Sequence, residues 1–187
     1  MVKCRKTSND RIWKLGQQTA RRCSQDIARE IKKEKEGINA QFLTQSLKGL
    51  PNFIGCFAEN QLSSIIINQY PTFVIANVDS FNMKGSHWLA IGIFKTSIEI
   101  FDPLGFTIFN WSRVPCGLLD FLHRMSVTRR VQVSPRVQPK NSHLCGFYCI
   151  FYLVLRSFVS MRTVNSFFCL LHSKLYRNDA ILYKFFK

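Results

Sequence analysis

Short apolar runs, rich in β-branched and aromatic residues, recur through the middle of the chain and are separated by turn-forming residues such as Gly, Pro and Asn. Runs of about four to eight such residues predict strands rather than helices. We therefore predict three neighbouring strands, and a fourth that Pro135 interrupts, at residues 73–78, 88–94, 98–101 and 131–137.

Three later segments have helical character. Residues 116–125 place leucines and a methionine at helical spacing, which is typical of a helix packed on a sheet. Residues 145–158 are apolar on nearly every face, which predicts a helix buried between layers. A final helix is predicted over 163–176. The expected fold class is α+β, with a small mixed sheet packed around a buried central helix that has Cys145 at its N-terminus.

The first forty residues differ from the rest. They hold 11 of the Lys and Arg residues and 5 of the Asp and Glu residues, with few large apolar side chains. We predict a basic N-terminal arm over 1–40, partly helical or disordered, with a charged helix over 24–36 that has Ser24 as its N-cap. Residues 41–187 contain nearly all the Phe and are predicted to form one domain, large enough to fold without disulfides or metal.

Composition narrows the class of protein. An apolar content of 47% with 20% charged residues excludes disorder throughout, and a net charge of +15 predicts attraction to polyanions, nucleic acid above all. Seven cysteines, an odd number, and a polar beginning of the chain predict reduced thiols in a protein that is not secreted. The longest apolar run, 144–155, is shorter than the roughly 20 residues of a membrane-spanning helix, so no membrane partner is expected.

Four residues in three segments form a candidate catalytic set: His87, Asp102, Gln138 and Cys145. A cysteine nucleophile needs a base, a group that orients the base, and donors for the oxyanion. His87 begins one predicted strand and Asp102 ends the next, so an antiparallel pairing would bring them to one edge of the sheet. Cys145 lies in the first turn of the buried helix, where free backbone N–H groups and the helix dipole favour an anion.

The remaining assignments follow from spacing. Ile98, Ile100 and Asp102 share a strand face and Glu99 points to the other, which makes Asp102 the better candidate acid. Gln138 precedes Cys145 by seven residues and can offer its side-chain NH₂ to an oxyanion, alongside the backbone N–H of Cys145. Gly146 is expected to leave room for a substrate backbone.

Each of these residues also has a structural interpretation. A single His, Cys or Gln is more often structural or solvated than catalytic, and Cys149, one helical turn after Cys145, is interpreted as a core residue. A second use of the same region is zinc binding, but its spacing matches no strong zinc-finger pattern. The residues concerned would be Cys145, Cys149, Cys169 and His172.

Taken together, these motifs resemble the adenovirus-type (adenain-like) cysteine endopeptidases, in the larger group that includes the ubiquitin-like-protein proteases. The similarity spans about residues 42–160. It rests on HWLA at 87–90, FDPLGF at 101–106, Gln138 with Asn141 and Ser142 after it, and CGFYCIFYL at 145–153. The last motif also resembles the adenain-like proteases of Polinton/Maverick elements and related adenovirus-like agents.

The resemblance implies a role for each residue: His87 as base, Asp102 as orienting acid, Cys145 as nucleophile and Gln138 as oxyanion donor. The adenoviral enzymes usually have Glu where this chain has Asp102, and Val127 stands where they have the cysteine that binds a peptide cofactor. No cofactor is therefore expected to be required, and DNA, a second activator in that family, is the candidate activator.

Three functions follow as hypotheses. The first is a thiol endopeptidase that cuts after Gly-type residues and matures virion proteins, such as capsid or core precursors, in the host nucleus and the virion. The second is removal of ubiquitin-like modifiers, in the nucleus or cytoplasm. The third is a basic nucleic-acid-binding module with a decayed protease site, against which the intact catalytic set argues. The sequence leaves the oligomeric state open.

Overall fold

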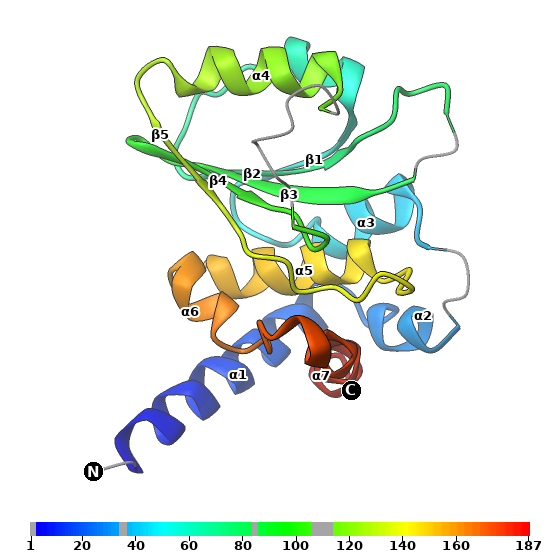
Figure 1. The fold of residues 1–187 in the computed structure, drawn as a ribbon, viewed down its shortest axis with the longest axis vertical. Helices are drawn as coiled ribbons and strands as arrows, with labels where there is room; N and C mark the ends of the chain where they lie inside the picture. Colours follow the sequence, from blue (N-terminus) through cyan, green and yellow to red (C-terminus); the bar gives the residue numbers. More distant parts are fainter. Residues whose placement is uncertain (1–2, 34–36, 84–85, 106–113) are drawn as a thin grey trace.

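The computed structural model describes residues 3–33, 37–83, 86–105 and 114–187, and in these ranges it leaves out the side chains of residues 3–8, 33 and 172. Five strands form one sheet in chain order (Figure 1). The central pairs, β2 with β3 and β3 with β4, are antiparallel, whereas the outer pairs, β1 with β2 and β4 with β5, are parallel. The strands are β1 (Phe53–Ala58), β2 (Thr72–Asn77), β3 (Trp88–Ile93), β4 (Ser97–Phe101) and β5 (Arg130–Val133).

Helices cover both faces of this sheet, with α4 on one side and α5 on the other (Figure 1). The α-helices are α1 (Lys3–Cys23), α2 (Ile27–Lys33), α3 (Ala40–Leu47), α4 (Cys116–Ser126), α5 (Cys145–Arg156), α6 (Met161–Asn165) and α7 (Asn178–Phe185). Two 3₁₀ helices, η1 (Glu59–Ser64) and η3 (His172–Arg177), complete the described elements. The predicted α+β class is confirmed, as are the predicted strands at 73–78, 88–94 and 98–101 to within one residue at each end.

Alternation along the strands divides the core into two clusters. Residues such as Val74, Ile91 and Ile100 face α4, while Phe73, Ile75 and Phe101 face α5. Because both faces are covered, the strands read as continuous apolar runs rather than as an apolar and polar alternation. This explains why the local composition, rather than a period of two, indicated these strands.

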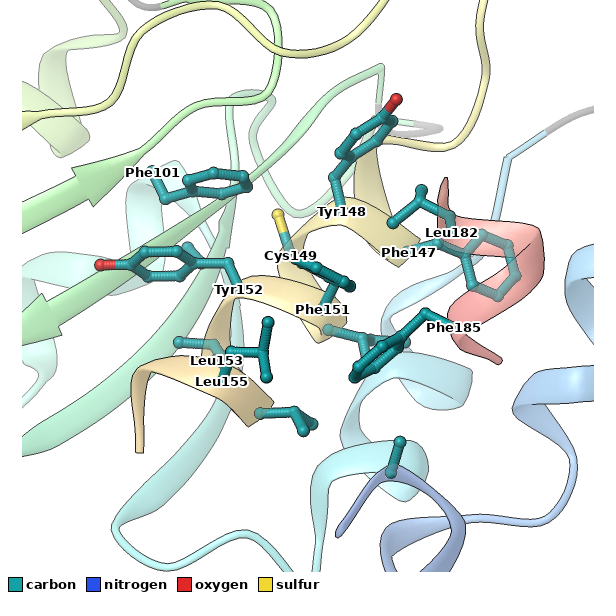
Figure 2. Packing of buried hydrophobic residues seen from close by; sticks show 14 of the residues in the cluster. Phe101, Phe147, Tyr148, Cys149, Phe151, Tyr152, Leu153, Leu155, Leu182 and Phe185 are labelled. Carbon is teal, nitrogen blue, oxygen red and sulfur yellow. The ribbon is translucent and has the colours of Figure 1, made fainter. Parts of the chain in front are cut away.

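Helix α5 lies at the centre of the larger cluster. All of its residues except Arg156 are buried, because the sheet, α1, α3, α6 and α7 surround it. Figure 2 shows its aromatic side chains among their neighbours, with the ring of Tyr152 face to face with that of Phe101 at a centroid distance of 4.3 Å. Helix α5 is apolar on nearly all sides, and it lies where nearly all of its surface is shielded from water.

The N-terminal segment is not an appended arm. Its described helices pack on the core: Trp13 makes edge contacts with Phe151 and Phe185, and Ala20 and Ile31 are buried in the same cluster as α5. A Cβ added at Gly16 would lie 2.4 Å from Leu155, so α1 approaches α5 as closely as a glycine permits. The buried and half-buried residues of this segment recur at helical spacing, Trp13, Gly16 and Ala20 in α1 and Ile27 and Ile31 in α2, which overall composition does not reveal.

The predicted helix over 24–36 is shorter in the structure. Helix α2 begins at Ile27 instead of following directly on Ser24, whose Oγ accepts a hydrogen bond from the backbone N–H of Asp26. Part of the predicted range, residues 34–36, lies outside the described residues.

The predicted C-terminal helix is also corrected. The range 163–176 is divided between α6, a non-helical stretch and η3, and a further helix, α7, follows. The cause is the side chain of Asn178, which bonds the backbone N–H and C=O of Cys169 at 2.8 and 2.9 Å. These bonds hold residue 169 in a non-helical conformation, and Leu170 and Leu171 are exposed as a result.

Strand β1 was not predicted, because no alternating pattern marks it in the sequence. In the structure its pairing with β2 shifts register between Phe53 and Gly55. The strand predicted over 131–137 ends at Val133. Across the described ranges, every helix is too short or too polar to cross a membrane.

Candidate active site

The pairing of β3 with β4 brings a histidine and a carboxylate together. Ala90 lies opposite Phe101, so the residues just before β3 and just after β4 meet at one edge of the sheet. There His87 Nε2 lies 2.7 Å from Asp102 Oδ1, and both side chains are largely buried. The predicted hairpin-like contact between His87 and Asp102 is therefore present.

The carboxylate of Asp102 is held in place by its surroundings. The backbone N–H of Leu104 donates to Oδ1 at 2.8 Å, so this oxygen accepts two hydrogen bonds. Ser134, just after β5, accepts from the Asp102 N–H at 3.0 Å and donates to its carbonyl at 3.2 Å. The acid is consequently a fixed partner for the imidazole rather than a mobile surface charge.

Glu99 requires a correction to the strand-face argument. It does point away from the side that Ile98 and Ile100 occupy, but that opposite side is the one covered by α5. Glu99 binds Tyr152 and both Nε and Nη2 of Arg156, about two and three turns along α5 from Cys145. Asp102 reaches the histidine because it lies beyond the end of β4, not because of the face it would share within the strand.

Cys145 is the first residue of α5 and is 8% exposed. As the first helical residue, it has a backbone N–H without a partner inside the helix. Burial lowers the pKa of His87, but hydrogen bonds and charge interactions with Asp102 and Cys145 outweigh this and raise that pKa to about 9. The second ring nitrogen, Nδ1, is buried and has no hydrogen-bond partner among the described residues. The histidine thus binds the acid through Nε2, and it interacts with Cys145 strongly enough for both groups to raise its pKa.

Gln138 enters the site from the loop after β5. Its side chain is buried and donates from Nε2 to the carbonyl of Ser142 at 2.6 Å, which leaves the second hydrogen of this NH₂ group unassigned. The carbonyl of Pro103 accepts from the N–H groups of both Val137 and Gln138, at 2.9 and 2.8 Å. The loop that carries Gln138 is therefore fastened to the residue that follows Asp102.

A cleft of about 630 Å³ connects three of the four predicted residues, His87, Gln138 and Cys145. Its volume is in the range of sites that enclose small ligands or peptide side chains. Asp102 does not line it, which is consistent with a residue that acts through the imidazole. The walls come from residues in the segments 37–40, 56–61, 77–83, 86–88 and 138–145.

Gly146 has a different role from the one expected. A Cβ at this position would lie 2.6 Å from Cγ1 of Ile38, so the space is filled by Ile38 instead of being open to a substrate. The carbonyl of Ile38 also accepts from Trp88 Nε1 at 2.8 Å. The glycine therefore allows residues around 38 to form one wall of the cleft against the start of α5.

Cys149 is a core residue, as interpreted from the sequence. It is fully buried, its Sγ donates to the carbonyl of Trp88 at 3.4 Å, and burial raises its pKa well above the ordinary thiol value. Among the described side chains, no group of three or more His, Cys, Asp or Glu is arranged to hold a metal ion, and the side chain of His172 lies outside them.

Asn77, at the end of β2, was missed by the sequence analysis. It is 4% exposed, pairs with Trp88 across β2 and β3, and lines the same cleft. Its Oδ1 accepts from the backbone N–H of Asp79 at 2.9 Å, while its Nδ2 is buried without a partner. An orphaned buried donor in a cleft is a candidate for binding a substrate carbonyl. No local pattern marks it, since its place depends on the register of two strands.

The chain matches no known family model, and a search of curated proteins finds no match either. The chemistry of the site is accordingly the guide to its function.

Proposed function

We propose that this protein is a thiol endopeptidase with Cys145 as nucleophile. The observation that carries the proposal is the buried contact of 2.7 Å between His87 and Asp102, with the pKa of the histidine raised by both Asp102 and Cys145. A histidine that is protonated at neutral pH beside a cysteine is the resting state of enzymes that use a thiolate–imidazolium pair. The charge of Asp102 stabilises that imidazolium.

The proposed reaction has two halves. The Cys145 thiolate attacks the scissile carbonyl carbon, and the oxyanion accepts hydrogen bonds from the Cys145 backbone N–H and Gln138 Nε2. His87 then gives its proton to the leaving amine, and a thioester remains on Cys145. In the second half His87 takes a proton from water, the resulting hydroxide displaces the thiolate, and the acid product leaves. Asp102 keeps its charge throughout.

The proposed substrates are proteins cut after small, Gly-type residues, as the resemblance to the adenain-like enzymes implies. Small residues in the lining of the cleft, Gly37, Ala40 and Ala58, leave room for a substrate backbone. We propose capsid or core precursors of a virus or virus-like element as the natural substrates, and the host nucleus and the virion as the place of action. The six cysteines with described side chains are free thiols, which fits an intracellular setting.

We also propose nucleic acid as a partner. The face of α1 opposite its buried side carries Arg11, Lys14, Arg21 and Arg22, all exposed, and the one acidic residue of this helix is Asp10. At 1.5 Å per residue this basic face extends over roughly 16 Å, long enough to contact several phosphates of one strand. This face of α1 is a defined candidate binding surface in a chain whose net charge is +15.

The test of the proposed function is cleavage of a Gly-containing peptide library by the purified protein, with Cys145→Ala as the variant that should lose all activity and keep its fold. Cys149→Ala should cut the same peptides and lose about 1 kcal/mol of stability, as expected for a small buried side chain. Labelling with iodoacetamide at neutral pH, followed by mass mapping, should modify Cys145 first. Preferential labelling of Cys149 or Cys116, or cleavage by the Cys145→Ala protein, would contradict the assignment.

A second arm of the same assay separates the two peptidase hypotheses. Ubiquitin-like modifiers with a C-terminal extension after Gly-Gly are offered beside peptides with an internal Gly motif. Cleavage restricted to the modifiers would favour deconjugation over virion maturation.

A further inference from the structure

The start of α7 binds both ends of the loop that carries Gln138. Asn178 is fully buried, and its Nδ2 donates to the carbonyl of Val137 at 2.7 Å. The next residue, Asp179, accepts from the hydroxyl of Ser142 at 3.0 Å. Residues 41 and 37 positions later in the chain thus hold the loop immediately before Gln138 and four residues after it.

Ser142 connects this contact to the amide of Gln138. Its carbonyl accepts from Gln138 Nε2 at 2.6 Å, while its hydroxyl donates to Asp179 Oδ1. Rotating the amide by half a turn would place Oε1 against this carbonyl, two acceptors in contact, so the position of Ser142 determines the direction in which the NH₂ group points. A shift of Ser142 would turn the donor with it.

We propose that Asp179 is a positioning residue of the active site, which holds Ser142 so that Gln138 presents its second amide hydrogen to the oxyanion. This inference rests on the proposed peptidase function. Asp179 does not line the cleft, and it acts on the oxyanion donor through Ser142.

The surroundings of Asp179 give it a fixed geometry. Its Oδ1 accepts two hydrogen bonds, from Ser142 and from the hydroxyl of Tyr148 at 2.8 Å, and Tyr148 belongs to the first turn of α5. Tyr148 is fully buried, so its hydroxyl needs this acceptor. Burial raises the pKa of Asp179, and the hydrogen bonds from Tyr148 and Ser142 act against that rise. One oxygen therefore relates α7, the nucleophile helix and the Gln138 loop to one another.

The experiment is a double-mutant cycle on peptide turnover. Gln138→Ala should lower kcat by about 100-fold, the effect of losing one oxyanion donor. Asp179→Ala should lower kcat by about 10-fold with KM changed less than about twofold, and Asp179→Asn, which keeps an acceptor oxygen, should recover most of that loss. In the Gln138→Ala background, Asp179→Ala should have an effect of less than about twofold, because the group through which it acts is already absent.

Controls separate positioning from folding. Tyr148→Phe together with Asp179→Ala leaves no orphaned hydroxyl in the core and should show the same kcat as Asp179→Ala. Asp120→Ala removes an exposed acid of α4 and should leave turnover unchanged. Full turnover by Asp179→Ala, or a loss that adds in full to that of Gln138→Ala, would overturn the inference.

A readout without catalysis keeps the inference distinct from the proposed function. The side-chain NH₂ resonances of Gln138, assigned in ¹⁵N-labelled protein by their disappearance in Gln138→Ala, report the orientation of the amide even if the protein cleaves no peptide. Asp179→Ala should shift or broaden them and Asp179→Asn should restore them. Unchanged resonances in Asp179→Ala would refute the positioning role, whereas absent turnover by the wild-type protein with shifted resonances would refute only the peptidase proposal.

Discussion

Replacing Asp102 by Asn tests the site most directly, and its effect can be worked out from the structure. The pKa of His87 lies at about 9 instead of 6.5 although burial alone would lower it. This difference corresponds to roughly 3 kcal/mol of preference for the protonated imidazole. Since the charge of Asp102 is a main source of that preference, Asp102→Asn should reduce kcat/KM at least about 100-fold while the fold remains intact.

Glu99→Gln is the matched control, because it also replaces a buried carboxylate by an amide, three residues before Asp102. Glu99 forms an ion pair with Arg156 and accepts from Tyr152, but has no contact with His87. Breaking a buried ion pair from one side costs about 3–5 kcal/mol, so this variant should unfold at a lower temperature and keep its activity per folded molecule.

The assay is turnover of a Gly-containing peptide, with the folded fraction measured by circular dichroism on the same samples. An NMR titration of His87 adds a direct check, since its pKa should fall in Asp102→Asn and stay near 9 in Glu99→Gln. If Glu99→Gln abolishes turnover in folded protein and Asp102→Asn does not, the assignment of the acid is wrong.

Three further predictions concern stability, substrate and partner. Because folding raises the pKa of His87, the contribution of this residue to stability is complete below pH 6.5 and is lost as the pH rises through about 9. Chemical denaturation should therefore give a smaller free energy of unfolding at pH 9.5 than at pH 6.5, and the part of this difference that is due to His87 should vanish in His87→Gln. Asn77→Ala should raise KM about 10-fold with little change in kcat if its orphaned Nδ2 binds a substrate carbonyl, and an unchanged KM would exclude that role. Replacing Lys14 and Arg21 by Glu should weaken the binding of duplex DNA and flatten its salt dependence, whereas the same replacement at Lys48 and Arg162 should not. An equal loss of DNA affinity in both double variants would show diffuse attraction instead of a binding surface on α1.

The parts of the fold that were predictable are those in which local pattern and burial agree. The strands β2 to β4 and helix α5 are surrounded on all sides, so their interiors are apolar apart from the ion-paired Glu99 of β4, and polar residues mark their ends. His87, Asp102 and Cys145 stand at such ends, where a change from apolar to polar is visible in the sequence. This is why the chemistry of the site could be proposed before its geometry was seen.

The parts that were not predictable depend on contacts distant in sequence. Helix α1 joins the core through a few apolar residues in a basic segment, and Asn178 breaks a predicted helix through bonds to Cys169. The sequence correctly predicted that Glu99 lies on the opposite face of β4 from Ile98 and Ile100. It did not predict which face of the sheet is covered by α5, because that depends on how the helix packs. Asp179 gives no local signal at all, since it lies 37 residues from Ser142.

The carbonyl of Pro103 has a consequence for how such a site can be switched off. It accepts from both Val137 and Gln138, so the backbone next to the acid and the backbone of the oxyanion donor share one acceptor. A distortion that moves Gln138 away must break these bonds and so release the backbone next to Asp102. The backbone of Asp102 is also bonded to Ser134, just after β5. The two halves of the proposed catalytic site are therefore mechanically coupled, and we expect an inhibitor that displaces either loop to disable both orientation of the imidazole and stabilisation of the oxyanion in a single step.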